Sequence, residues 1–169
     1  MRCFTCGCDR RSRMDDERRR LAVRSPLGDL VASLDRDGRI VGLVFAEGNE
    51  AAGVDVAAGG VQGLIDDWFA SGELPAGVIA WPRASDFQRQ VWQAAMAVGR
   101  GATCSYRELA EALGRPRAVR AVAAALAANP VLLLVPCHRV LGSDGSLRGY
   151  AGGLARKRRL LTIEGALPG

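Results

Sequence analysis

The sequence has only one histidine, His138, among its 169 residues, and it has no apolar run of membrane-spanning length. Its N-terminal stretch is rich in arginine and lacks the apolar core of a secretory signal peptide. We therefore expect no membrane association and a cytoplasmic location. A hydrophobic content of 49% also excludes general disorder, and the chain is long enough for one domain or two small ones.

Cysteine is too sparse and too unevenly placed for a secreted disulfide framework. Three of the five cysteines, Cys3, Cys6 and Cys8, stand together near the N-terminus, and the other two are Cys104 and Cys137. Three crowded thiols with the only histidine far away in the sequence make a poor tetrahedral zinc set. We expect a reactive but incidental tail here rather than a metal site.

The net charge of +5 is unevenly distributed along the chain. Residues 1–20 carry a net +3, residues 21–82 a net −6, and residues 83–169 a net +8. These ranges are the expected divisions: a disordered basic tail, an N-terminal α/β scaffold domain and a C-terminal domain that carries the chemistry. A basic C-terminal half favours a polyanion as partner, although a basic surface without a partner remains open.

Residues 21–82 predict a small α/β unit with no visible chemistry, which we interpret as a scaffold. Its expected elements are a strand, a hairpin turn, a second strand, a loop, a helix and a short third strand: residues 27–34, 35–38, 39–46, 51–60, 61–70 and 78–81. The turn sequence, Asp-Arg-Asp-Gly, is typical of a β-hairpin. The helix is expected to end near Gly72.

The C-terminal half begins with two capping boxes, each of which predicts the start of a helix. They are Ser85–Gln88 and Ser105–Glu108, in which a serine is followed three residues later by Gln or Glu. Gly114 is expected to end the second helix, and a third helix is predicted over residues 117–128. Two short helices joined by a glycine-containing turn are typical of a helix-turn-helix.

The composition of the third helix is unusual for a helix that reads bases in the major groove. Residues 118–128 are nearly all small, and Arg120 is the only long cation among them. Such a smooth helix suits close approach to a backbone or a narrow groove, with one side chain inserted. An alanine helix packed tightly in the core is the alternative. Residues 154–163 predict a basic amphipathic helix.

A distinctive segment runs from Asn129 to Val140. Five apolar residues, 131–135, lie between two prolines, so we predict a short buried rod that presents Cys137 and His138 at its end. Attack by a thiol requires the thiolate, hence a base and a group that orients the base. His138 and Glu164 can fill these roles, and a buried structural cysteine is the alternative.

From about Ser85 to Gly165 these features form an ordered series of motifs. They are Phe87-Gln-Arg-Gln-Val-Trp92, Ser105-Tyr106, Arg117-Ala-Val-Arg-Ala-Val122, Asn129-Pro130, Pro136-Cys-His-Arg-Val140, Gly149-Tyr-Ala-Gly-Gly153, Leu160-Leu161 and Glu164-Gly165. The series resembles the O6-alkylguanine-DNA alkyltransferases, also called methylated-DNA–protein-cysteine methyltransferases. The earlier stretches Ser25–Leu30 and Trp68-Phe69 look like the N-terminal domain of that family.

This resemblance implies a fold and an activity. The fold is an α/β N-terminal domain, with a small RNase H-like antiparallel sheet plus a helix, followed by a mainly α-helical domain with a winged-helix-like helix-turn-helix. The activity is DNA repair by direct damage reversal: a single-turnover methyltransferase moves an alkyl group from O6-alkylguanine or O4-alkylthymine to Cys137. The partner is double-stranded DNA, the protein acts as a monomer, and neither cofactor nor metal is needed.

The resemblance also implies roles for individual residues in the reaction. Cys137 accepts the alkyl group, His138 takes the thiol proton through a water, and Glu164 holds the imidazole. Tyr106 gives a proton or hydrogen bond to the guanine ring, which improves the leaving group. Asn129 braces the turn before the cysteine, and Arg139 supports the same site.

Further residues are implied to bind DNA and the extruded base. The third helix enters the minor groove, and Arg120 fills the gap left in the stack. Two alanines of that helix and three residues of the base pocket complete the set: Ala118, Ala121, Val140, Tyr150 and Ala151. Ala151 replaces a serine of some relatives, so one hydrogen bond of the pocket is absent.

Two other functions remain as alternatives to alkyl transfer. A DNA-binding regulator would use the helix-turn-helix without chemistry, but it has no need of Cys137. A Cys-His hydrolase for small molecules would use the cysteine, but it requires neither the basic half nor Arg120. Alkyltransferase-like lesion sensors lack the acceptor cysteine, which this chain has.

Overall fold

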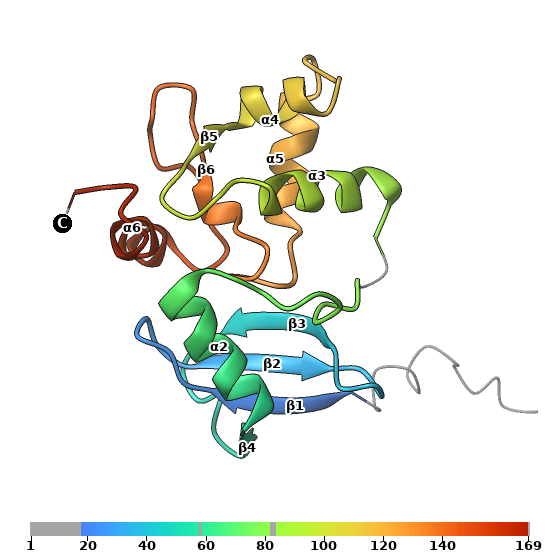
Figure 1. Cartoon of the computed structure of the whole chain (residues 1–169), viewed down its shortest axis with the longest axis vertical. Coiled ribbons are helices and arrows are strands. Elements are labelled where there is room, and N and C mark those ends of the chain that lie inside the picture. The colour runs from blue at the N-terminus through green and yellow to red at the C-terminus, as the bar shows by residue number, and fades with distance from the viewer. Residues whose placement is uncertain (1–17, 58, 82–83, 169) are drawn as a thin grey trace, which may run out of the picture.

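The computed structural model describes residues 18–57, 59–81 and 84–168. Figure 1 shows a small sheet covered by one helix, with the remaining helices stacked beyond the sheet. We call the first group the sheet unit: β1 (Arg19–Val23), β2 (Leu30–Leu34), β3 (Ile40–Phe45), β4 (Asp55–Val56) and α2 (Gly60–Ser71). The helical unit contains α3 (Asp86–Met96), β5 (Cys104–Ser105), α4 (Tyr106–Ala112), α5 (Val119–Ala127), the 3-10 turn η1 (Cys137–Arg139), β6 (Val140–Leu141) and α6 (Leu154–Ile163).

The four-stranded sheet is mixed, with the order β3-β2-β1-β4. β2 pairs antiparallel with both β1 and β3, as the predicted hairpin requires. β4 pairs parallel with β1, which corrects the expected antiparallel sheet and the expected loop over residues 51–60. The connection after β3 crosses to the far edge of the sheet, and β4 therefore enters in the same direction as β1.

Two further sequence expectations differ from the structure of this unit, and a third falls on residues that the structure does not describe. β1 begins at Arg19, so the charged tail predicted over residues 1–20 extends too far, because its last arginines pair with β2. The expected strand at residues 78–81 is only an isolated bridge between Ile79 and Ile40. Cys3, Cys6 and Cys8 lie outside the described residues.

Local turn and cap chemistry follows the sequence closely. Asp35 Oδ1 accepts hydrogen bonds from the backbone N–H groups of Asp37 (3.0 Å) and Arg39 (2.8 Å), which closes the predicted hairpin. Both capping boxes are formed, at Ser85 for α3 and at Ser105 for α4. α2 ends at Gly72 in the left-handed conformation that glycine adopts without strain (φ 79°).

The helix-turn-helix consists of α4 and α5, with Gly114 (φ 68°) in the turn between them. α5 buries Val122, Ala125 and Leu126, and the indole Nε1 of Trp92 donates to the carbonyl of Ala125 (2.8 Å). The opposite face is exposed and consists of small residues and one cation: Arg120, Ala121, Ala124, Ala127 and Ala128. The alanine-rich helix thus packs on one side and leaves a smooth open face on the other.

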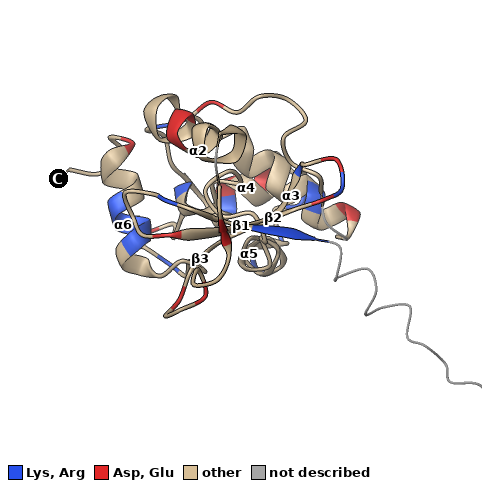
Figure 2. Cartoon of the chain, turned by 90° about the horizontal axis from the view of Figure 1, so that it is seen from below, with Lys and Arg blue, Asp and Glu red and all other residues tan. Residues whose placement is uncertain are grey.

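Charge follows the division between the two units. Figure 2 shows acidic residues on α2 and basic residues along α6. No helix among the described residues is long and apolar enough to cross a membrane.

Candidate functional site

The nucleophile candidate Cys137 begins the short turn η1 and is only 7% exposed. Burial raises the pKa of its thiol, while a hydrogen bond from Asn129 and the charge of Lys157 oppose that rise. The Nδ2 atom of Asn129 lies 3.4 Å from Cys137 Sγ. A thiol in this setting is protonated at neutral pH and needs a base before it can attack.

Asn129 also organises the segment that leads to the cysteine. Its Nδ2 donates to the carbonyl of Val135 (3.0 Å), and its Oδ1 accepts from the N–H of Val131 (2.9 Å). The backbone curls between these points, with Leu133 at φ 69° and a hydrogen bond from Val135 N to Val131 O. The five apolar residues are buried as predicted, but the expected rod is wrong: the segment is a compact turn held by one amide side chain.

His138 is fully buried, and its Nε2 lies 3.1 Å from Oε1 of Glu164. Burial lowers the pKa of the imidazole, and the neighbouring carboxylate opposes this effect. An ionised carboxylate can only accept a hydrogen bond, so in the neutral imidazole Nε2 carries the proton. The other nitrogen, Nδ1, has no hydrogen-bond partner among the described residues and is left as a base.

Glu164 caps the end of α6 and is clamped by Arg139. The guanidinium donates through Nε to Oε2 (2.9 Å) and through Nη2 to Oε1 (2.9 Å), and it also donates through Nη1 to the carbonyl of Val98. Burial alone would raise the pKa of Glu164, but the hydrogen bonds and charges of His138 and Arg139 outweigh it and lower the pKa to about 2. The carboxylate therefore stays ionised and holds the imidazole in one tautomer.

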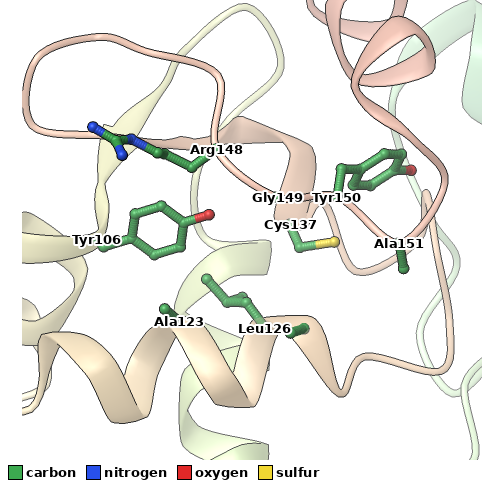
Figure 3. A pocket seen from close by; sticks show the side chains of 9 residues that line it. Tyr106, Ala123, Leu126, Cys137, Arg148, Gly149, Tyr150 and Ala151 are labelled. Atoms are coloured by element: carbon green, nitrogen blue, oxygen red, sulfur yellow. The ribbon is translucent and has the colours of Figure 1, made fainter.

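A cavity of about 330 Å³ opens in front of the thiol. Figure 3 shows Cys137 between the phenol of Tyr106 and the loop that carries Tyr150. The walls of the cavity come from α4, α5, η1 and the glycine-rich loop: Tyr106, Ala123, Leu126, Ala127, Cys137, Arg148, Gly149, Tyr150 and Ala151. The cavity has room for a flat ring system, and the thiol lies in its wall.

Tyr106 and Cys137 line the same cavity. Each lies next to one strand of a short parallel pair: Tyr106 directly follows β5, and Cys137 lies three residues before β6. Burial raises the pKa of Tyr106, a negative charge on Cys137 would raise it further, and Arg148 opposes the rise. The phenol therefore remains a proton donor at neutral pH.

The structure separates the predicted DNA-contacting and base-contacting residues. Arg120 and Ala121 lie on the exposed face of α5, while Ala118 is half-buried at its start. Tyr150 and Ala151 line the cavity.

Val140, around which the backbone was expected to line the base pocket, is fully buried and is not among the residues that line the cavity. Its carbonyl accepts a hydrogen bond from Lys157 Nζ (2.7 Å). Arg148 and Gly149 do line the cavity, and the sequence interpretation passed over them although they directly precede Tyr150.

Lys157 is the most important residue that sequence reasoning missed. It was assigned to the basic face of an amphipathic helix, but its side chain is fully buried and also donates to the carbonyl of Arg148 (2.8 Å). Burial lowers its pKa to about 8. One signal could have found it: it is the only lysine in a chain otherwise supplied with arginine.

No group of three or more metal-ligating side chains occurs within residues 18–57, 59–81 and 84–168. The reactive groups at and behind the cavity are a buried thiol, a neutral imidazole backed by a carboxylate, and a phenol. This set can remove a proton from sulfur and donate one to a leaving group.

Comparison with known proteins gives a consistent result. The family described as "6-O-methylguanine DNA methyltransferase, DNA binding domain" matches residues 86–166. The methylated-DNA–protein-cysteine methyltransferase of Salmonella typhimurium is 46% identical over 110 residues, which is 64% of each chain. That of Mycolicibacterium paratuberculosis is 52% identical over 82 residues, 48% of this chain and 50% of the relative. These matches thus span between half and two thirds of the relatives' lengths.

Solved structures extend the likeness over both units. A Mycobacterium tuberculosis OGT crystallised with DNA has a TM-score of 0.71 and 35% identity, with 87% of this chain and 92% of that one covered. The O6-methylguanine-DNA methyltransferase of Pyrococcus kodakaraensis has a TM-score of 0.67 and 26% identity, with 86% and 98% covered. With these similarities and the ordered motifs around Cys137, the chain belongs to the O6-methylguanine-DNA methyltransferase family.

Proposed function

We propose that the protein repairs alkylated DNA by transferring the alkyl group from O6 of guanine to Cys137. The observation that carries this proposal is the arrangement at one cavity: a buried thiol lies in its wall, and the imidazole behind it is held by Glu164 and has no hydrogen-bond partner for Nδ1 among the described residues. The names of the relatives state the same reaction type, and the Mycobacterium tuberculosis structure contains DNA.

The reaction is a single in-line displacement at the alkyl carbon. His138 Nδ1 takes the proton of the Cys137 thiol through a bridging water, and the thiolate forms a bond to carbon as the bond from carbon to O6 breaks. Tyr106 donates a hydrogen bond or proton to the guanine ring, which leaves as ordinary guanine. If Tyr106 has given its proton to guanine, the imidazolium returns a proton to the phenol; if Tyr106 has donated only a hydrogen bond, the proton of the imidazolium goes to guanine. In both cases the proton lost by the thiol ends on the base, and the products are a thioether and guanine.

Burial and nearby charges control when the thiol of Cys137 becomes a thiolate. The thiol is protonated in the resting site because burial raises its pKa. Lys157 and the amide of Asn129 both favour the thiolate once the proton has moved. The Glu164 carboxylate stabilises the imidazolium that forms, as an orienting acid does in nucleophile–base–acid triads.

The exposed face of α5 suits a minor groove. Its small residues, Ala121 and Ala124 among them, allow close approach, and Arg120 can occupy the space vacated by an extruded nucleotide. The same helix lines the cavity with Ala123, Leu126 and Ala127. A base that leaves the stack beside Arg120 therefore has a short path to Cys137.

We also propose that each protein molecule accepts only one alkyl group. A thioether is stable, and the other described cysteine, Cys104, lies outside the cavity with a pKa raised to about 11 by burial and by the charge of Glu108. We further propose double-stranded DNA with O6-alkylguanine or O4-alkylthymine as substrate, a monomeric protein and no cofactor. The RNase H-like and winged-helix-like descriptions of the two units, the domain limits and a cytoplasmic location remain predictions.

The test is a titration with duplex DNA that carries radiolabelled O6-methylguanine. The expected result is a rapid transfer that stops at one methyl group per protein molecule. Cys137→Ala should abolish transfer, and Cys104→Ser, which removes a thiol outside the cavity, should not change it. Repeated turnover, or transfer by the Cys137→Ala variant, would refute the proposal.

A further inference from the structure

The imidazole of His138 is in contact with the sheet unit as well as with its own neighbours. Trp68, in the last part of α2, is 3% exposed, and its indole meets the imidazole edge-on with ring centroids 6.0 Å apart and an interplanar angle of 81°. Tyr150 makes a similar contact at 6.2 Å and 79°. Two aromatic rings thus pack on the histidine, and one of them comes from outside the helical unit.

A single arginine ties that end of α2 to the helical unit. Arg100 follows α3 and donates through Nη1 to the carbonyl of Trp68 (3.3 Å) and through Nη2 to that of Phe69 (2.9 Å). A cation is favourable here because the C-terminal end of a helix is its negative end. The side chain lies so close over Gly72 that a Cβ there would be 2.9 Å from Arg100 Cδ.

The loop that carries Arg100 also supports the ion pair behind the histidine. The carbonyl of Val98 accepts a hydrogen bond from the guanidinium of Arg139. A Cβ on Gly101 would lie 3.0 Å from the carbonyl oxygen of Glu164, so the loop packs directly on the backbone of that residue. Residues 98–101 therefore connect the end of α2 to both members of the Arg139–Glu164 pair.

We propose that Trp68 and Arg100 are positioning residues for the reaction, with the end of α2 serving as the wall that fixes the imidazole of His138. Trp68 supplies the wall, and Arg100 holds it against the loop that supports Arg139 and Glu164. The sheet unit is then part of the active site rather than only a scaffold. The consequence for alkyl transfer rests on the function proposed above, whereas the effect on the imidazole does not.

The wall acts by keeping water from the imidazole. The charged or titratable groups facing His138 are Glu164, Arg139 and Lys157, with Cys137 and Tyr150 beside them, and burial is the main cause of its lowered pKa. Opening the wall would hydrate the ring and move the pKa of His138 back towards its usual value of about 6.5. The ring would also gain freedom to leave the orientation that a base requires.

The chain is well suited to a direct test because it has one histidine. In untagged protein the imidazole C–H signals in NMR spectra belong to His138 alone, and their pH titration reports its pKa. The variants are Trp68→Ala, Trp68→Phe, Arg100→Ala and Arg100→Lys. Matched controls are Asp67→Asn, an exposed neighbour of Trp68 on the same helix, and Arg89→Ala, an arginine of α3 paired only with exposed Asp86 in the described structure.

We expect Trp68→Ala and Arg100→Ala to raise the pKa of His138 and to slow methyl transfer roughly tenfold, since the imidazole is a general base. Because protonation removes the base, the loss should be larger at about pH 6 than at about pH 8. Trp68→Phe and Arg100→Lys should restore most of the wild-type pKa and rate. Asp67→Asn and Arg89→Ala should leave both unchanged.

Two readouts keep the outcomes separate. If wild-type protein transfers no methyl group, the proposed function fails, and the NMR titration still tests the positioning role. If folded Trp68→Ala and Arg100→Ala variants keep the wild-type pKa of His138, the positioning role is wrong. A rate loss that is equal at both pH values and not relieved by the conservative variants would also overturn it.

Discussion

At the scale of a single residue, the carboxylate of Glu164 has two roles. Its carboxylate accepts a bidentate contact from Arg139 and lies 3.1 Å from His138 Nε2, all in an interior position. The contact with Arg139 pairs two buried charges of opposite sign, and the contact with His138 fixes the tautomer of the imidazole. Because each partner would otherwise be a buried, unpaired polar group, stability and chemistry depend on the same carboxylate.

Glu164→Gln should lower the free energy of unfolding at neutral pH by about 3 kcal/mol. The folded pKa of about 2 lies below the usual value of 4.5, so the ionised carboxylate stabilises the fold above pH 4.5. That contribution is lost as the pH falls through this window towards 2. The difference between wild type and variant in urea unfolding should therefore shrink in acid.

The exposed Glu111 provides the control for this measurement. Glu111→Gln should change the free energy of unfolding little at any pH. A Glu164→Gln deficit that stays constant down to about pH 2 would show that the loss is one of packing, not of ionisation.

At the scale of elements, α5 links an exposed face, which carries Arg120, to the cavity. One face packs on Trp92, a second lines the cavity, and the third is the open row with Arg120. The small side chains that make the helix smooth are also those that let it pack closely. Composition alone therefore could not separate a core helix from a groove-binding one, and the structure contains both faces.

Arg120→Ala should slow repair of O6-methylguanine in duplex DNA far more than transfer from the free base. The reason is that only the duplex substrate requires extrusion, at a cost of a few kcal/mol. Rates with the two substrates, measured side by side, provide the comparison. Arg158→Ala, an exposed arginine on α6, serves as the control for general loss of charge. Equal losses on duplex and free base would argue against the extrusion role.

At the scale of the whole molecule, the two units are joined at the segment that precedes the nucleophile. The backbone of Leu43 in β3 donates to Pro130 (2.8 Å) and accepts from Leu132 (2.8 Å), and Figure 1 shows β3 as the strand nearest the helical unit. Arg156 of α6 stacks over Phe45 at 4.5 Å and donates to the carbonyl of Leu27 (3.1 Å). The cysteine turn is thus anchored on the sheet edge.

This anchoring predicts that the cysteine becomes accessible only when the whole fold is lost. Urea unfolding followed by circular dichroism and by alkylation of the peptide containing Cys137 should give the same midpoint. The second probe is read by mass spectrometry so that other thiols do not contribute. Labelling of Cys137 at clearly lower urea would mean that the helical unit opens independently of the sheet.

Short-range chemistry explains what the sequence predicted well. The capping boxes at Ser85 and Ser105 and the hairpin turn at Asp35 depend on residues a few positions apart, and all three are confirmed. The motifs also singled out the residues that meet at the cavity, including Tyr106 and Cys137.

Long-range packing explains what the sequence could not predict. The turn before Cys137 depends on a left-handed Leu133 and on pairing with β3, neither of which has a local signature. The basic amphipathic pattern of residues 154–163 predicts a surface position for Lys157, whereas the carbonyls of Val140 in β6 and of Arg148 hold its side chain inside. The contact between Trp68 and His138 joins residues that share no motif.

The central claim is that the alkyl group ends on Cys137. Wild-type protein in excess is incubated with duplex DNA carrying O6-methylguanine and digested, and the peptide containing Cys137 is weighed. The account predicts that this peptide alone gains the mass of a single methyl group, in an amount equal to the lesion supplied. An unmodified Cys137 peptide, or a methyl group on any other residue, would contradict it.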